Sequence, residues 1–357
     1  MQIRASVRSH AIIMLSVTLL VGSTACASST VIQGDRRSTA TPSSGRPTPE
    51  TGGLFSGEQP WTTDVSSVKR SDRSDSIIAT LTRLGGWGND NVFQTDFSIP
   101  IFFADEATPR AQVIGIDGYC YGGPDCDEVP AQIPVPANAN MEGSEDLSCD
   151  VSQQDCHLLV VDRNDDKLYE VYQGNKEGDD VTAMGLFVWD LGKSYPETLR
   201  GDQCTSADAA GFPIAGLTPT ADEVAAGGVD HALRFILPND RMKADVYVRP
   251  ATHAGGPEST DPNAPPYGVR LRLKSDFDDS GFGASQKVIL AALKKYGMFL
   301  SDGGEIALTF ADDRTSIAKW ADLGIDSGSF SAIPPDAFEV VELGADVPLT
   351  YDCVRNP

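Results

Sequence analysis

The pattern of apolar and polar residues predicts many short strands and two longer helices. Residues 74–84 and 285–296 repeat apolar side chains three and four positions apart, which is typical of amphipathic helices, and a glycine follows each segment. A capping-box pattern starting at Thr220 predicts a shorter helix. Elsewhere apolar and polar residues alternate, as they do in strands. The strand-like segments are residues 112–116, 157–162, 167–172, 183–191, 305–310, 338–343 and 349–353.

Residues 91–103 alternate only in part, because Pro100 interrupts the run. Proline has no N–H to donate to a neighbouring strand. We therefore expect short extended segments there rather than one continuous strand.

Three further strands are predicted between residues 229 and 274, and we expect the domain to be organised around them. Successive side chains of a strand point to opposite faces of the sheet. Val246, Val248, Val269, Leu271 and Leu273 should therefore build a core. Cationic side chains should occupy the opposite face, because they alternate with these residues. They are Arg234, Arg249, Arg270, Arg272 and Lys274.

These elements together predict a mainly β protein, a β-sandwich or jelly roll with a few short helices. The chain has no internal repeat, and strands and helices do not alternate as in a Rossmann fold or TIM barrel. We expect a single β-rich domain at residues 65–357. Within it, residues 118–156 form a Gly- and Pro-rich loop region that carries four of the cysteines.

The N-terminus reads as an export signal. Arg4 and Arg8 precede an apolar run at residues 11–21 that is too short to span a bilayer. Residues 1–25 are therefore predicted to be a signal peptide, and the small residues before Cys26 resemble a lipobox, which would make Cys26 a lipidation site. Ordinary cleavage before Ser28 is the alternative. Residues 26–64 are rich in Ser, Thr, Pro and Gly, which predicts a disordered tether.

Composition narrows the range of partners. The formal net charge is −23, which argues against nucleic acid, whose phosphates attract a basic surface. It also argues against adsorption to an anionic membrane, so attachment is expected only through a lipid anchor.

The cysteines agree with an exported protein. Apart from Cys26 there are six, and an even number in an exported chain favours disulfides. The close spacings predict the pairs Cys120–Cys126 and Cys149–Cys156, which leaves Cys204 to pair with Cys353. No CxxC spacing suggests zinc, and residues 162–166 lack the glycine of a calcium loop. We predict no metal and no cofactor.

Two interpretations of the cationic strand face remain open. The arginines are ordinary solvated residues paired with some of the 51 acidic residues, or they line a groove that binds a carboxylate or a sugar. In the second interpretation the substrate-binding residues are Arg234, Arg249, Arg270, Arg272 and Trp189.

If the protein is an enzyme, histidines or carboxylates are the candidate groups for proton transfer. His231 and His253 lie in the same stretch, and an unperturbed imidazole titrates near neutral pH. Asp278 and Asp302 are the first carboxylate pair, with Glu170 as a further choice. A glycosidase needs two such groups. The predicted catalytic residues are therefore His231, His253, Asp278 and Asp302.

Three segments resemble a group of exported bacterial proteins to which no activity is attached. They are TSADAAGFPI at residues 205–214, DHALRF at 230–235 and YGMFLSDGG at 296–304. The resemblance spans about residues 156–341, and it implies that residues 229–274, Asp208 and Asp302 belong to one unit.

The sequence leads to two functional hypotheses. The first is an exported enzyme that acts on a polysaccharide or another extracellular glycan, either a polysaccharide lyase or a glycoside hydrolase. In the lyase, arginines would neutralise a uronate carboxylate and a histidine would abstract the adjacent proton. The second is a non-catalytic glycan-binding or structural lipoprotein of the cell envelope.

Overall fold

The computed structural model describes residues 53–356 and is mainly β, with 26% strand against 17% helix. The predicted fold class is therefore confirmed. The predicted signal peptide, Cys26 and most of the predicted tether lie outside the described residues. Among residues 53–356, no helix is long and apolar enough to cross a membrane.

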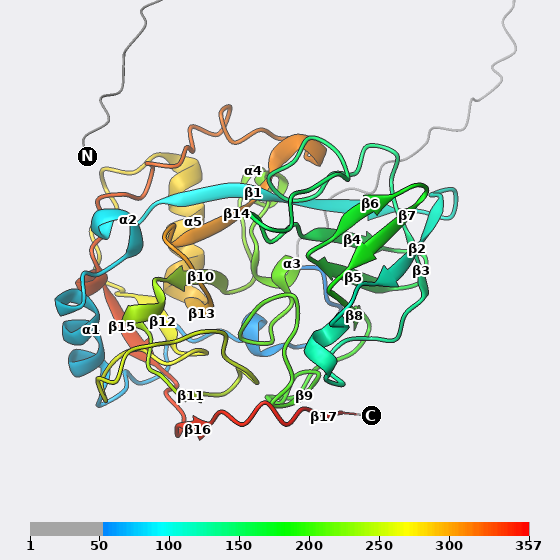
Figure 1. The fold of residues 1–357 in the computed structure, drawn as a ribbon. Coiled ribbons are helices and arrows are strands. Elements are labelled where there is room, and N and C mark those ends of the chain that lie inside the picture. Colours follow the sequence, from blue (N-terminus) through cyan, green and yellow to red (C-terminus); the bar gives the residue numbers. More distant parts are fainter. Residues whose placement is uncertain (1–52, 357) are drawn as a thin grey trace, which may run out of the picture. The chain divides into compact units, whose positions relative to one another are not determined.

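The main element is a mixed sheet of nine strands (Figure 1). The middle strand pairs, β10–β13, β14–β1 and β1–β4, are parallel, and the remaining pairs are antiparallel. In spatial order the strands are β15 (Phe338–Val341), β12 (Arg270–Leu273), β13 (Met298–Gly303), β10 (Leu233–Leu237), β14 (Leu308–Asp312), β1 (Thr95–Ala104), β4 (Leu158–Asp162), β5 (Lys167–Tyr172) and β8 (Gly185–Asp190).

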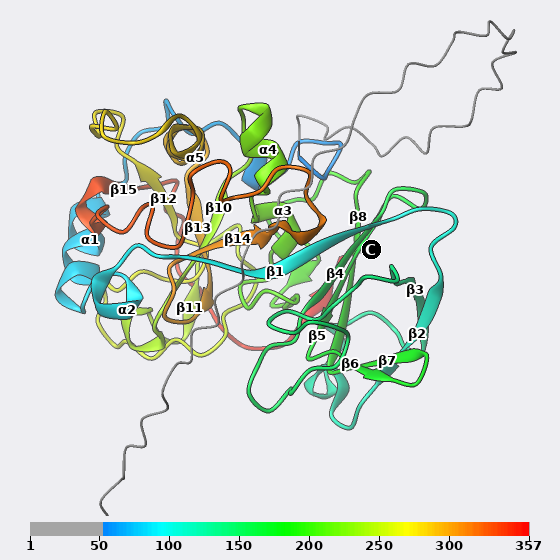
Figure 2. The same cartoon turned by 90° about the horizontal axis from the view of Figure 1, so that it is seen from above.

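Strand β1 joins the two halves of this sheet, contrary to the short segments expected there. Its first half pairs with β14 and its second half, from Ile101, pairs with β4. Pro100 lies at the change of partner, where a missing N–H costs little, so the strand continues through it. Figure 2 shows β1 running from one half of the sheet to the other.

A second sheet gives one half of the molecule its sandwich character. Four strands, in the order β3 (Ala131–Pro134), β2 (Arg110–Gly115), β7 (Asp180–Ala183) and β6 (Asn175–Glu177), form this sheet. Their inward side chains Val113, Ile133 and Val181 pack against Val160 and Leu186 of the main sheet. The two sheets thus enclose a core of their own.

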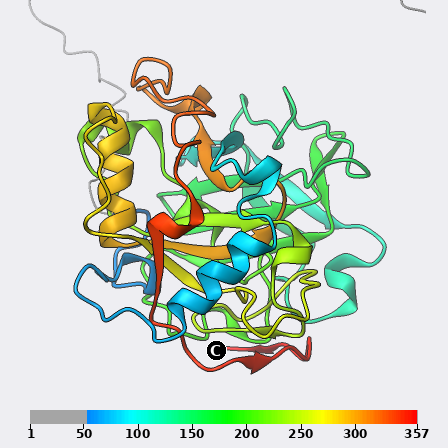
Figure 3. The same ribbon diagram turned by 90° about the vertical axis from the view of Figure 1, so that its left-hand side faces the viewer.

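The predicted helices form and pack on the other half of the main sheet. They are α1 (Ser74–Arg83) and α5 (Ala284–Lys295), and Figure 3 looks onto this end, where α1 lies beside β15. The capping box at Thr220 opens α4 (Ala221–Ala226), whose Glu223 N–H donates to the Thr220 hydroxyl. The shorter helical turns are α2 (Gly88–Asn91), α3 (Ile214–Leu217), η1 (Pro60–Thr62), η2 (Tyr119–Gly122), η3 (Asn239–Arg241), η4 (Asp313–Thr315) and η5 (Pro335–Ala337).

The folded domain begins earlier than the sequence predicts. Phe55 and Trp61 are buried, and their rings meet at 5.2 Å between centroids. Phe55 also packs edge-on against Trp189 and Tyr195. Residues 53–64 are therefore part of the domain rather than of a tether, because two large aromatic rings are enough to hold a segment that is otherwise poor in apolar residues.

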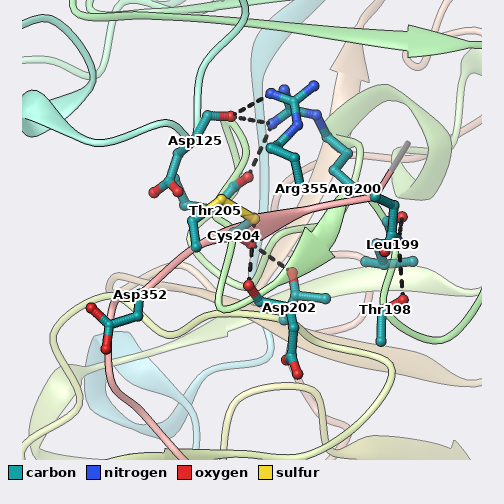
Figure 4. Close-up of a disulfide and its surroundings, with 12 residues drawn as sticks. Asp125, Thr198, Leu199, Arg200, Asp202, Cys204, Thr205, Asp352 and Arg355 are labelled. Carbon is teal, nitrogen blue, oxygen red and sulfur yellow. Dashed lines mark hydrogen bonds between the residues drawn. A yellow bond between two sulfur atoms is a disulfide. The ribbon is translucent and has the colours of Figure 1, made fainter.

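The C-terminal segment crosses the molecule as a strap, defined here as residues 343–356. Along it, β16 (Val347–Pro348) pairs with β11 (Val246–Tyr247), and β17 (Val354–Arg355) pairs with β9 (Gly201–Asp202). All three predicted disulfides are present: Cys120–Cys126, Cys149–Cys156 and Cys204–Cys353. The last ties the strap to the loop after β9 (Figure 4). Three disulfides indicate an oxidising compartment.

Candidate functional site

The predicted cationic face exists, but it is closed to ligands. Arg270 and Arg272 are buried, and each guanidinium group is paired, with Glu342 at 2.8 Å and Glu339 at 2.6 Å. Their remaining N–H groups donate to backbone carbonyl groups of residues 63, 65 and 68. Residues 63–68, where the predicted tether meets the predicted domain, therefore cover this face, and both guanidinium groups are bonded within the protein.

Arg249 is separated from the other arginines. Strand β11, which precedes it, belongs to a two-stranded sheet with β16 and not to the main sheet. Its guanidinium contacts the Asp202 carboxylate at 2.6 Å and lies 5.5 Å from the centre of the Tyr247 ring. The expected common face of Arg234, Arg249 and Arg270 is thus wrong, because β11 is not a neighbour of β10 and β12.

The two predicted catalytic histidines are held by the fold through contacts with residues other than Asp278 and Asp302. His231 is buried, with Nδ1 at 2.8 Å from the Ala232 carbonyl and Nε2 at 3.5 Å from Glu223. His253 contacts the Ala209 carbonyl at 2.9 Å and packs against the Tyr351 ring. Burial lowers the pKa of His253.

Two further predicted residues do not form a site. Asp278 lies on an exposed turn, where it accepts from the Ser280 N–H. Trp189 is fully buried, and its Nε1–H donates to Glu170 at 3.0 Å, so its ring cannot stack on a sugar. Glu170 is buried as well, and burial raises its pKa to about 7.

Arg234 is the centre of a cluster that does fit a functional site. Its Nη2 lies 3.2 Å from Asp208 and 3.5 Å from Asp302, and Nη1 donates to the Thr309 hydroxyl at 3.1 Å. Arg234 and Asp208 are buried, whereas 28% of the Asp302 side chain is exposed. We name Asp208, Arg234, Asp302 and Thr309 the Arg234 cluster.

Each of the three segments that resemble exported bacterial proteins supplies one charged member of this cluster. Asp208 lies in residues 205–214, Arg234 in residues 230–235 and Asp302 in residues 296–304. The structure brings into contact residues that are 26 and 68 positions apart in the chain.

A β-bulge directs Asp302 toward Arg234. Arg234 pairs with Phe299 across β10 and β13, so alternation would send residue 302 to the opposite face. The register shifts between Phe235 and Ile236, and Ile236 then pairs with Asp302. The extra residue returns Asp302 to the face of Arg234, as bulges near functional sites often do.

A second ion pair lies next to the Arg234 cluster. The Nδ1 atom of His157, just before β4, is 2.6 Å from Glu142 Oε2, and its Nε2 is 3.2 Å from the Ala207 carbonyl. Glu142 also accepts from the Ser98 hydroxyl at 3.0 Å. Asp96 faces Thr309 across β1 and β14 and accepts from Ser98. Polar groups therefore form a row across the sheet from Asp302 to His157.

Burial and neighbouring charges shift the pKa values of the carboxyl groups in this row in opposite directions. Burial raises the pKa of Asp302 and of Asp208, although Arg234 opposes this. For Glu142, burial is outweighed by His157 and Ser98, and its pKa falls to about 2. Burial likewise opposes the charge of His157, but Glu142 raises its pKa to about 9. Glu142 is therefore ionised at neutral pH, while Asp302 retains its proton to a higher pH than usual.

One group of possible metal ligands lies within residues 53–356. It consists of Asp125, Cys204 and Cys353. The two sulfur atoms form a disulfide with each other, so this group offers a metal ion one free ligand. The nearby guanidinium groups of Arg200 and Arg355 donate to the Asp125 backbone carbonyl (Figure 4).

No known protein family, curated protein or solved structure matches this chain. The resemblance to exported bacterial proteins therefore stays a prediction, and the functional argument depends on the site itself.

Of the site residues, the sequence predicts Arg234 and Asp302 and indicates Asp208 through the resemblance. Glu142 and His157 were missed. Glu142 lies in the Gly- and Pro-rich region at residues 118–156, where no periodicity assigns a direction to a side chain. His157 follows Cys156 of a predicted disulfide and begins a predicted strand, which were the signals available for it.

Proposed function

We propose that this protein is an exported enzyme that cleaves glycans by hydrolysis, with Asp302 as the general acid and Glu142 as the ionised partner. One observation carries the proposal: two partly exposed carboxyl groups lie in one polar row in different surroundings, since Asp302 shares Arg234 with Asp208 whereas Glu142 is paired with His157, and these surroundings displace their pKa values in opposite directions. Such a split assigns an acid and a base or nucleophile within one site. Glycoside hydrolysis needs such a pair.

In the proposed reaction Asp302 donates its proton to the bridging oxygen as the C–O bond breaks. The Glu142 carboxylate either attacks the anomeric carbon or takes a proton from the attacking water. One water is added across the bond, and both carboxyl groups return to their starting state. Arg234 acts as a positioning residue, since it contacts Asp302 directly.

The structure does not favour the polysaccharide lyase mechanism. This mechanism needs free arginines to neutralise a uronate carboxylate, and Arg270 and Arg272 are buried against Glu342 and Glu339. A non-catalytic glycan-binding or envelope protein remains the second candidate, because buried ion-pair networks also displace pKa values.

The test is a panel of extracellular glycans incubated with the purified, disulfide-intact protein, with detection of new reducing ends and of unsaturated uronate absorbance. We expect new reducing ends without that absorbance. Asp302→Asn and Glu142→Gln should each lower the rate by about 10²- to 10⁴-fold. Asp278→Asn is the matched control and should leave the rate unchanged. Binding without cleavage would favour the second candidate, and unsaturated products would restore the lyase.

The proposal includes a location. The disulfides place the folded domain in an oxidising compartment, and we propose that the chain is exported and carries lipid on Cys26. Mass spectrometry of the mature N-terminus tests this: a diacylglyceryl group on Cys26 supports both parts of the proposal, an N-terminus at Ser28 keeps export but contradicts the lipid anchor, and an uncleaved chain contradicts export.

A further inference from the structure

An exposed aromatic ring stands beside the proposed catalytic groups. Tyr121 lies in η2, and 73% of its surface is exposed. A large apolar ring left in water gains no stabilisation from burial. Among residues 53–356, Tyr121 is the most exposed of the large hydrophobic side chains.

The loop around Tyr121 fixes the ring in this exposed place. Cys120 and Tyr121 both have left-handed backbone conformations, with φ of 54° and 50°, which L-residues adopt at a cost of about 1 kcal/mol or more. The Cys120–Cys126 disulfide and the hydrogen bond from the Cys120 N–H to the Met184 carbonyl, 2.7 Å long, hold the loop in this shape. Strained residues that the surroundings hold in place cluster at ligand sites.

A continuous set of contacts joins Tyr121 to the site. The Cys120 N–H donates to the Met184 carbonyl, and the Met184 N–H donates to the Tyr172 carbonyl at 3.1 Å, so the loop of Tyr121 lies against the end of β5 beside Tyr172. The Tyr172 ring lies 5.6 Å from the His157 ring, tilted by 40°, and His157 holds Glu142. Tyr172 is half-buried at the end of β5, so the two tyrosines lead from the surface to the Glu142–His157 pair.

We propose that Tyr121, supported by Tyr172, is a stacking platform for an uncharged sugar ring next to the scissile bond. The apolar C–H face of a pyranose matches the face of a tyrosine ring, and the hydroxyl groups around its edge match the phenol hydroxyls. This inference rests on the proposed hydrolase and adds a binding subsite and a substrate class to it.

The charge of the surroundings selects an uncharged sugar. Glu142, Asp155 and Asp302 lie near one another, since Asp155 acts electrostatically on both His157 and Asp302. The cations of this row are already paired, Arg234 with Asp208 and Asp302 and His157 with Glu142. A uronate carboxylate would meet like charge and find no free arginine, which disfavours it.

The experiment measures binding in the Asp302→Asn background, where cleavage does not obscure it. The probes are neutral oligosaccharides (cello-, xylo-, manno- and chito-oligosaccharides) and oligogalacturonate, titrated by calorimetry. We expect a neutral probe to bind and oligogalacturonate not to bind. Adding Tyr121→Ala should weaken that binding about three- to tenfold, whereas Tyr121→Phe should retain it. Ile317→Ala removes another exposed apolar side chain and should have no effect.

The outcomes separate this inference from the proposed function. Neutral-glycan binding that depends on Tyr121, without cleavage by the native protein, would keep the platform and remove the enzyme. Cleavage with a KM that Tyr121→Ala leaves unchanged would keep the enzyme and overturn the platform. Preferential binding of oligogalacturonate, or no binding of any neutral probe, would also overturn it.

Discussion

At the scale of single residues, Asp302 and Glu142 differ in what surrounds them. Asp302 shares one guanidinium group with the buried Asp208, so a single positive charge serves two carboxyl groups. Glu142 pairs with His157 and also contacts the Ser98 hydroxyl, which it shares with Asp96. Desolvation therefore dominates for Asp302 and raises its pKa, whereas pairing dominates for Glu142 and lowers its pKa.

The same contacts make stability depend on pH. The pKa of His157 is raised from 6.5 to about 9 in the folded protein, so its contribution is fully present below pH 6.5 and is lost as pH rises through about 9. The pKa of Glu142 is lowered from 4.5 to about 2, so its contribution is present above pH 4.5 and is lost as pH falls through about 2. The ion pair should therefore stabilise the fold most between pH 4.5 and 6.5.

Urea titrations of the native protein and of His157→Gln at several pH values measure this. The difference in free energy of unfolding should be about 3 kcal/mol at pH 5 to 6 and should shrink toward pH 9 and above. His253→Gln is the control. The pKa of His253 is lowered in the folded protein, so the free energy of unfolding of the native protein should increase relative to that of this variant as pH rises toward 6.5. A His157 difference that stays constant with pH would refute the ion pair.

At the scale of elements, alternation in the sequence predicts which side chains share a face but not what covers that face. Arg270 and Arg272 do lie opposite Leu271 and Leu273, yet residues 63–68 lie over them. The residues up to 64 look like a tether because their composition is polar, and the domain is predicted to begin only at residue 65. The segment is held in place by Phe55, whose ring packs against Trp189 and Tyr195, and by Trp61, whose carbonyl accepts from the Ala232 N–H; these partners lie more than a hundred positions away.

Two irregularities of the strands account for the rest of the difference. Pro100 lies where β1 changes partner, so a residue that normally ends a strand is tolerated. The bulge opposite Ile236 places Asp302 on the same face of the sheet as Arg234, whereas simple alternation predicts the opposite face. The alternation of apolar and polar residues does not reveal a bulge. Asp302 could therefore be predicted as a site residue, but its position beside Arg234 could not.

At the scale of the whole molecule, the disulfides connect distant parts of the chain. Cys204 and Cys353 are 149 positions apart, and the strap they anchor also contacts Gln203, whose amide donates to the Pro348 carbonyl at 3.0 Å. Gln203 and Cys204 precede Asp208 in the same loop. The strap therefore supports the loop that brings Asp208 to Arg234.

The stabilisation from each disulfide should follow the length of chain that it closes. Loop-closure entropy predicts a loss of about 5 kcal/mol when the Cys204–Cys353 link is removed as the double alanine variant. The same change at Cys120 and Cys126, which are six positions apart, should cost about 2 kcal/mol. Denaturant unfolding measures both values. Equal losses would show that loop closure does not determine the contribution of the strap.

The most direct test of the account is an NMR titration of the carboxyl carbons of Asp302 and Glu142, assigned by comparison with Asp302→Asn and Glu142→Gln. The account predicts that Asp302 titrates above 3.8 and Glu142 near 2, so that the ordinary order of the two pKa values is reversed. An Asp302 that titrates at or below 3.8, or a Glu142 that titrates at its usual 4.5, would contradict the assignment of acid and ionised partner.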